Sequence, residues 1–407
     1  MKRKARPGPR DLVSAAVLGV GGVALAWLCV RTTAIEVLPA DAPALLRIAS
    51  HNPDVVLEEA SDALVTRRGI LPPDMLAAVR GAALAAPLDA RSFLILGHQQ
   101  WLDGHPDHAV KTFEAGQRLD PRLRLIHLLL LDRYLRSGRY ADAAAQFSVL
   151  ARLAGEARGP TVKAMAAMSL DPQTRDAVRA TLRIDPTLER NVLMAMAKGD
   201  TPPATIFALA SPAAQADAAN AESWGPALVK RLAEQKRYGA ARQVWHRIYR
   251  LSDAQANAPI FNAGFAEGRN APPFDWSLAA GSLGAADMRN NGLAIDYYGR
   301  DSGDLASQIL VLKPGRYRFA VAIDPGKTDN AAKLFWSLTC RTDGKASLMN
   351  LPVIAGAAKR TIAADLVVPA DCPAQTLTLR SEAGEFPAPV SVTIRDLDLR
   401  PVAGARP

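Results

Sequence analysis

The sequence predicts a multidomain protein that begins with an N-terminal transmembrane helix, continues as an α-helical part and ends in an all-β part. Three observations predict this order. An uncharged stretch of 19 residues runs over Leu12–Val30. A pattern of small and aromatic residues then recurs after 34 residues, which is typical of repeated pairs of α-helices. From about residue 274 onward, apolar and polar residues alternate, which is the period of β-strands.

The uncharged stretch has the length of a membrane span. At about 1.5 Å per residue, Leu12–Val30 extends roughly 28 Å, close to the hydrocarbon thickness of one bilayer. Five Lys and Arg residues precede it, so the positive-inside rule places residues 1–11 in the cytoplasm and the bulk of the chain in the periplasm. A cleaved signal peptide is the alternative. We expect a retained anchor, residues 12–30, that crosses the inner membrane once.

The positive charge of the chain is concentrated beside this span. The formal net charge is +9, and residues 1–31 contribute +5 from six Lys and Arg residues against one Asp. The other 376 residues therefore carry only +4. They show no basic patch with interleaved aromatic residues, which is the footprint of a nucleic-acid-binding surface. We expect the membrane, and no nucleic acid, as a partner.

The recurring pattern assigns a physical role to each position. Glycine permits a left-handed helix end, alanine lets two helices approach closely, and phenylalanine fills the space between helix layers. Because fewer than three repeats would not be stable alone, we expect helical repeats over residues 43–255, with degenerate units completing the stack. The recurring pairs are Gly104 and Gly138, Ala109 and Ala143, and Phe113 and Phe147.

These residues resemble the tetratricopeptide repeat. The first unit also has Leu96-Gly97 and Asp120-Pro121 at the positions expected by that pattern, and the second unit lacks both. The resemblance implies that first-helix residues face a ligand groove. The alternative is that Trp101 and its apolar neighbours only pack against adjacent helices. The candidate groove residues are Arg91, His98, Trp101, Asp132 and Arg136.

A change in composition precedes the β part. Residues 256–273 are rich in Asn, Gly and Pro, and we interpret them as a linker. Alternating segments such as Tyr317–Ile323 and Leu334–Cys340 follow, separated by Gly and Pro turns. They predict an antiparallel β-sandwich over residues 274–402.

The cysteines divide between the span and the sandwich. Cys29 lies in the apolar span, where we expect a thiol to act as an apolar side chain. Cys340 and Cys372 both lie in the β region, and an isolated pair in one domain outside the cytoplasm is most simply a disulfide. Two cysteines with no histidine nearby in sequence cannot make a closed zinc site.

The β region resembles the jelly-roll, carbohydrate-binding-module-like domains of membrane-anchored repeat proteins from alphaproteobacteria. The resemblance rests on Phe274-Asp275-Trp276, Gln308–Tyr317 and Cys372–Leu377. It implies a jelly roll and a link to exopolysaccharide production. Trp336 shares its strand face with Leu334 and Leu338, so we expect it in the core. Tyr297 and Tyr298 are adjacent, so one must point away from the other in a strand. The candidate glycan contacts are Trp276, Tyr297 and Tyr298.

Catalytic and metal-binding patterns are scarce. The sequence has no Gly-x-Ser-x-Gly, Walker or His-Glu-x-x-His motif. His105 and His108 fall at a turn between helices, and Glu382 and Glu385 fall in a loop after a strand, where polar residues are the default. We expect no catalytic residue, no cofactor and no metal.

These observations together predict a non-catalytic, membrane-anchored scaffold that faces the periplasm and serves exopolysaccharide biosynthesis or export. Its helical repeats would bind envelope or polysaccharide-assembly proteins, and its sandwich would bind a glycan. Two alternatives stay open. One is a glycan-active enzyme or accessory with a hydrolase- or lyase-like sandwich, and the other is an envelope chaperone.

Overall fold

A computed structural model describes residues 9–38, 42, 49, 51–66, 69–266, 272–324, 327–328, 333–342, 346–354, 358–385 and 389–402. Residues 1–8 of the predicted tail, 43–48 of the predicted repeats and 267–271 of the predicted linker lie outside this description. The chain forms two compact units, Met1–Leu188 and Glu189–Pro407.

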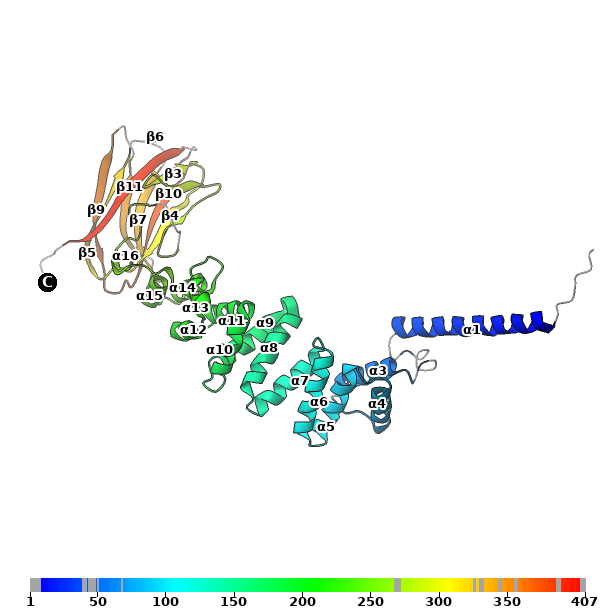
Figure 1. Cartoon of the computed structure of the whole chain (residues 1–407). Helices are drawn as coiled ribbons and strands as arrows, with labels where there is room; N and C mark the ends of the chain where they lie inside the picture. Colours follow the sequence, from blue (N-terminus) through cyan, green and yellow to red (C-terminus); the bar gives the residue numbers. More distant parts are fainter. Residues whose placement is uncertain are drawn as a thin grey trace, which may run out of the picture. The chain divides into compact units, whose positions relative to one another are not determined.

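The predicted fold class is confirmed, because helices extend to Asn257 and strands begin at Ser277 (Figure 1). The helices are α1 (Pro9–Val37), α3 (Pro53–Thr66), α4 (Pro73–Ala85), α5 (Ala90–Leu102), α6 (Pro106–Leu119), α7 (Arg124–Arg136), α8 (Tyr140–Ala154), the 3-10 helix η1 (Gly155–Arg158), α9 (Gly159–Met168), α10 (Arg175–Ile184), α11 (Pro186–Lys198), α12 (Pro203–Leu209), α13 (Pro212–Ala216), α14 (Trp224–Glu234), α15 (Tyr238–Tyr249) and α16 (Asp253–Asn257).

Helix α1 contains the predicted span. Its segment Val20–Val37 has 18 residues with a mean hydropathy of 1.4, and none of it is buried against the rest of the described chain. Among the described residues, α1 is the helix that is long and apolar enough to cross a membrane. An N-terminal signal sequence meets the same criterion, so membrane attachment is indicated by length and composition.

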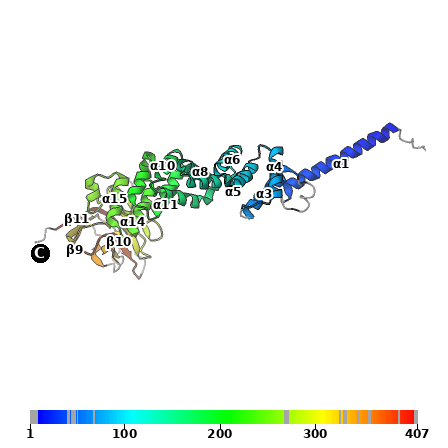
Figure 2. The same ribbon diagram turned by 90° about the horizontal axis from the view of Figure 1, so that it is seen from below.

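The helices α5 to α8 form two successive hairpins that pack on each other (Figures 1 and 2). Ala109 and Ala143 are fully buried where the helices of each hairpin meet. Gly104 and Gly138 take positive φ angles of 83° and 71° in the two turns, as expected for left-handed helix ends. Gly97 has a different reason to be glycine, since a Cβ atom there would lie 2.7 Å from the ring of Phe113.

A third, more degenerate hairpin consists of α14 and α15. Tyr238, Ala241 and Trp245 are buried at the positions where the pattern requires an aromatic, a small and an aromatic residue. Unlike α5 to α8, this hairpin belongs to the unit Glu189–Pro407, which also contains the β-sandwich.

The β region consists of two antiparallel sheets, as expected of a jelly-roll-like sandwich (Figure 1). One sheet has the order β1-β4-β10-β7-β8, and the other has the order β2-β3-β11-β5-β9 with β6 paired to β11. The strands are β1 (Ser277–Leu278), β2 (Gly284–Arg289), β3 (Gly292–Tyr297), β4 (Gly303–Leu310), β5 (Gly315–Ile323), β6 (Lys327–Thr328), β7 (Lys333–Cys340), β8 (Ser347–Val353), β9 (Arg360–Val368), β10 (Gln375–Glu382) and β11 (Val390–Pro401).

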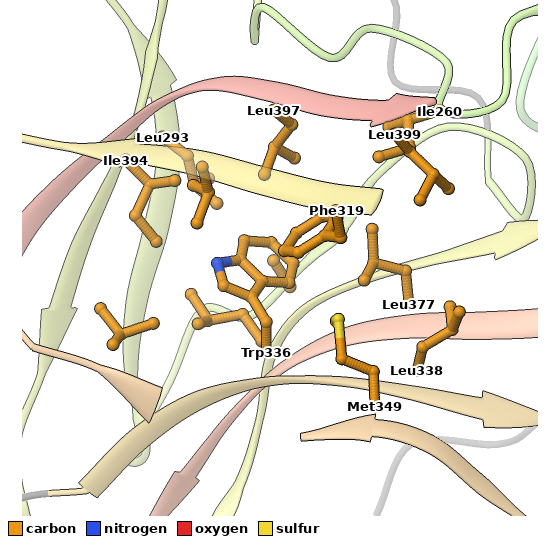
Figure 3. Close-up of a cluster of buried hydrophobic side chains, with 14 of the residues drawn as sticks. Ile260, Leu293, Phe319, Trp336, Leu338, Met349, Leu377, Ile394, Leu397 and Leu399 are labelled. Atoms are coloured by element: carbon orange, nitrogen blue, oxygen red, sulfur yellow. The ribbon is translucent and has the colours of Figure 1, made fainter. Parts of the chain in front are cut away.

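Side chains from both sheets meet in one hydrophobic core (Figure 3). Trp336 of β7 is fully buried beside Phe319 of β5, as expected from its place in the alternating pattern. Cys340 and Cys372 form the predicted disulfide, with Cα atoms 5.7 Å apart. Burying these apolar faces against each other is the main stabilising contribution to the sandwich.

The segment predicted as a linker packs into this core. Ile260 and Phe265 are buried among the sandwich side chains, and Gln308 of β4 makes hydrogen bonds to both the backbone N–H and the carbonyl of Phe261. The Asn, Gly and Pro residues of this segment indicate irregular backbone, whereas its apolar residues provide the contacts. The described part of this segment is therefore packed as part of the sandwich domain and does not act as a free linker.

Candidate functional site

Arg91, the first predicted groove residue, ties helices together. Its guanidinium lies 2.7 Å from Asp54, 2.9 Å from Glu58 and 2.5 Å from Asp89. Burial would raise the pKa of Asp89, but the hydrogen bonds and positive charge of Arg91 outweigh it and hold that pKa below its usual value. With three carboxylates around it, Arg91 holds α5 against α3 and is not available to a ligand.

The other four predicted groove residues lie in one connected cluster. The rings of His98 and Trp101 are 5.4 Å apart, and the guanidinium of Arg133 lies 4.2 Å from the centre of the Trp101 ring. Asp132 makes ion pairs with both Arg133 and Arg136. This cluster places a cation over an indole face, an arrangement that stabilises and orients the guanidinium.

Two groups in this cluster have shifted pKa values. Burial lowers the pKa of His98, and the positive charge of Arg133 lowers it further, so the imidazole is neutral near pH 7. Burial acts to raise the pKa of Asp132, but hydrogen bonds from Arg136 and Arg133 reverse the effect and lower it. Asp132 therefore stays ionised and keeps both arginines oriented.

A pocket of about 660 Å³ adjoins this cluster at the turn end of the hairpins. It lies between the beginning of α6 and the end of α7, where the turns that contain Gly104 and Gly138 are found. Four cations and two carboxylates give the lining a net charge of +2, and Asp132 and Asp142, which pair with its arginines, bring the local balance to zero. The charged residues of the lining are Asp107, Lys111, Glu114, Arg133, Arg136 and Arg139.

Arg139 lines the same pocket and is oriented in the same way as Arg133. Its guanidinium lies 4.3 Å from the centre of the Tyr134 ring, and its Nε donates to Asp142 at 2.7 Å. The Tyr134 hydroxyl donates to Glu114 at 2.8 Å, and burial together with this bond raises the pKa of Tyr134. Two aromatic rings thus hold two guanidinium groups at the pocket.

Sequence reasoning found only one residue of the pocket lining, Arg136. It missed Arg133, Arg139 and Lys111 because it considered first-helix positions along a groove, whereas the pocket lies at the turn end. A signal was present in the spacing, since Arg133, Arg136 and Arg139 recur every three residues through the Ser137-Gly138 turn.

The structure corrects two of the three predicted glycan contacts. Trp276 is fully buried, with its indole N–H donating to the Asn262 carbonyl, and Tyr297 is 1% exposed, with its hydroxyl donating to the Asp301 carbonyl. Neither ring can reach a ligand, because each packs within the core. Tyr298 is the first residue after β3 and is 47% exposed.

The face of the first sheet opposite its core carries a second candidate surface. Residues paired across antiparallel strands point to the same side, so Ser307, Thr378, Ser337 and Asn350 form a polar row across β4, β10, β7 and β8. Thr378 and Ser337 in the middle of this row are buried, and Asn350 at its end is exposed. Phe335 and Arg380 form part of the neighbouring row. The alternation that places Trp336 in the core also places the adjacent Phe335 on the opposite face of β7.

The residues considered for metal binding or acid catalysis are not gathered into a site. His105 and His108 are exposed, with ring centres 6.1 Å apart. Glu382 ends β10 and Glu385 follows in the loop, both exposed. Within the part of the chain that the structure describes, no three His, Cys, Asp or Glu side chains are grouped to hold a metal ion.

Searches with protein-family models and of curated proteins gave no match to this chain. Among solved structures, one titled "CBM4 structure and function" aligns 99% of its length with 35% of this chain, at 18% identity and a TM-score of 0.27. The CBM22-1 xylan-binding domain of Paenibacillus barcinonensis Xyn10C aligns 94% of its length with 35% of this chain, at 13% identity and a TM-score of 0.26.

A helical protein is also among the similar structures. The APC/C hetero-tetramer Cut9-Hcn1 aligns over 56% of this chain and 47% of its own, at 16% identity and a TM-score of 0.27. The assignment of the fold rests on the chain's own helix hairpins and paired sheets.

Proposed function

We propose that this chain is a non-catalytic adaptor, anchored in the inner membrane by α1 and facing the periplasm, that serves exopolysaccharide biosynthesis or export. Its helical hairpins bind a protein partner, and its sandwich binds a glycan. The anchor and its orientation are supported by the uncharged span and by the five basic residues before it.

The observation that carries the proposal is the pocket on the helical hairpins. Arginines held over aromatic rings and beside carboxylates lose little side-chain freedom when a ligand binds, which favours recognition. Arg133 and Arg139 are held in this way, and the cavity of about 660 Å³ is in the size range of ligand sites.

Copurification tests the adaptor function. The tagged full-length chain, cross-linked in cells and purified from membranes, is expected to bring specific envelope proteins with it. Trp101→Ala with Arg136→Ala is expected to lose them, whereas Arg118→Ala, an exposed arginine at the far end of α6, is expected to keep them. Equal recovery with all three proteins would refute a role for this site.

The same preparation separates the adaptor from the alternatives. Release of reducing ends from the cell's own polysaccharide, abolished by Glu382→Ala, would identify an enzyme. Suppression of the aggregation of unrelated unfolded proteins would identify a chaperone. An adaptor is expected to do neither.

Glycan binding is proposed for the sandwich face that carries Phe335 and for the exposed Tyr298. Affinity electrophoresis in gels containing the cell's own exopolysaccharide is expected to retard the full-length chain. Phe335→Ala and Tyr298→Ala are expected to reduce the retardation. Val367→Ala changes an exposed side chain in β9 of the other sheet and is the control. Unchanged migration of the native chain would remove the glycan from the proposal.

A further inference from the structure

We infer that the pocket between α6 and α7 binds an acidic peptide segment of a protein partner through the carboxylates of that segment. This inference rests on the proposed adaptor function and names the chemistry of its protein-binding site. The pocket lies at the turn end of the hairpins and shares only Arg136 with the groove that the sequence predicts.

Two cationic groups of the lining, Arg136 and Lys111, have donors left for an anionic ligand, whereas Asp132 and Asp142 balance the +2 charge of the lining as a whole. Arg136 uses its Nε to bind Asp132 at 2.9 Å and is 71% exposed, so its two Nη groups point to solvent without a partner among the described residues. The exposed Lys111 ammonium likewise has no ion pair or hydrogen bond within the described chain. Free donors of this kind match a carboxylate, which a guanidinium binds with two parallel hydrogen bonds.

Two arginines of the lining are already in position. Arg133 lies over Trp101 and Arg139 lies over Tyr134, with centroid distances of 4.2 and 4.3 Å. Arg133 also pairs with Asp132, and Arg139 pairs with both Asp142 and Glu114. A ligand carboxylate therefore meets guanidinium groups whose conformational freedom is already restricted, which favours affinity.

The two acids of the lining favour a peptide over an anionic polysaccharide. Asp107 and Glu114 would repel a polymer with a negative charge on every sugar. A peptide instead presents backbone N–H groups between its carboxylates, and these can donate to Asp107, whereas Glu114 already accepts from the Tyr134 hydroxyl and from Arg139.

Fluorescence anisotropy tests this inference on the full-length chain in detergent micelles. The probe is a short fluorescein-labelled peptide of alternating Glu and Ala, and the matched control peptide has Gln in place of Glu. The Glu peptide is expected to bind, and added salt is expected to weaken it. Arg136→Ala and Lys111→Ala are each expected to weaken binding about tenfold, the loss of one charge-assisted hydrogen bond. Arg118→Ala is expected to have no effect.

Several outcomes would overturn the inference. These are equal binding of the Gln peptide, unchanged affinity in Arg136→Ala, or tighter binding of an oligogalacturonate than of the Glu peptide. Circular dichroism of each variant verifies its fold, and the exposure of Arg136 makes a folding defect an improbable cause of lost binding. If the peptide fails while envelope proteins still copurify through Trp101 and Arg136, only the acidic-peptide inference is lost. If copurification also fails, the adaptor function falls with it.

Discussion

Trp276 and Trp336 show two ways in which a buried indole is accommodated. Both are fully buried in the sandwich core, with ring centres 5.9 Å apart in an edge-to-face arrangement. Trp276 donates its N–H to the Asn262 carbonyl at 3.1 Å. The N–H of Trp336 has no hydrogen-bond acceptor among the described residues and lies among aromatic and aliphatic side chains (Figure 3). Aromatic edges and faces replace only part of a hydrogen bond.

Replacing each indole by a phenyl ring separates the two situations. Trp276→Phe and Trp336→Phe remove the same volume, but only the first leaves a carbonyl without its donor. We expect the free energy of unfolding to fall by about 1–2 kcal/mol more for Trp276→Phe. Urea unfolding followed by circular dichroism measures the difference. Equal losses would show that the bond to Asn262 contributes nothing.

At the scale of elements, two glycines of one hairpin are needed for different reasons. Gly104 takes a positive φ in open space, with no atom within 4 Å of a Cβ placed there. Gly97 lies inside a helix, and a Cβ there would meet the Phe113 ring at 2.7 Å. The first requirement concerns the backbone and the second concerns packing.

The two alanine variants should therefore differ. Gly104→Ala is expected to cost about 1 kcal/mol through its left-handed backbone alone. Gly97→Ala is expected to cost up to about 3 kcal/mol, because the Phe113 ring must move within a packed layer. Thermal melting of the full-length chain, followed by the helical signal in circular dichroism, would contradict this account if Gly104→Ala were the more damaging change.

The disulfide makes a separate contribution to the sandwich. Cys340 and Cys372 are separated by 32 residues, and closing a loop of that length restricts the unfolded chain by about 3–4 kcal/mol. We expect the double variant Cys340→Ser, Cys372→Ser to lose stability of that order. Adding a reductant to the native protein should reproduce the loss and should leave the double variant unchanged. A native protein insensitive to reductant would contradict the prediction.

A structural feature can be predicted from the sequence when the residues that determine it lie close together in the chain. The roles of Gly104, Ala109 and Phe113 could be predicted because all the requirements of a helix hairpin fall within one repeat. The disulfide could be predicted because only two cysteines lie in the β region. The burial of Trp276 could not be predicted, since it depends on contacts with Asn262 and Trp336, which come from other parts of the fold. The stacking of Arg133 on Trp101 depends likewise on a contact between different hairpins.

At the scale of the whole molecule, the last hairpin folds with the sandwich. Trp245 of α15 is fully buried and packs edge-on against Phe261, with ring centres 4.9 Å apart. Arg341, next to the disulfide, donates to the Tyr238 hydroxyl at 3.2 Å and to Thr376 at 3.0 Å. Helix and sheet in Glu189–Pro407 therefore pack directly on each other, and we expect them to unfold together.

Calorimetry should accordingly resolve two transitions, one for each compact unit. Trp245→Ala is expected to destabilise its unit by about 3–5 kcal/mol, because it leaves a large cavity between helix and sandwich. The loss should appear in the amide I infrared band of the strands as well as in the helical signal. Gln243→Ala, at an exposed site on the same helix, is the control. If the strand signal melted at the same temperature in Trp245→Ala as in the native chain, the hairpin and the sandwich would unfold independently, contrary to this prediction.

The placement of the tryptophans has an optical consequence. Of the six in the chain, Trp224, Trp245, Trp276 and Trp336 are all at most 1% exposed in Glu189–Pro407. The unit Met1–Leu188 has only Trp27, in α1, and Trp101, which lies beneath the Arg133 guanidinium. A molecule that draws Arg133 away from the indole changes the electric field at Trp101 and hence its emission wavelength. With Trp27 replaced by Phe, Trp101 is the single tryptophan of the unit Met1–Leu188, and its fluorescence reports whether the pocket is occupied.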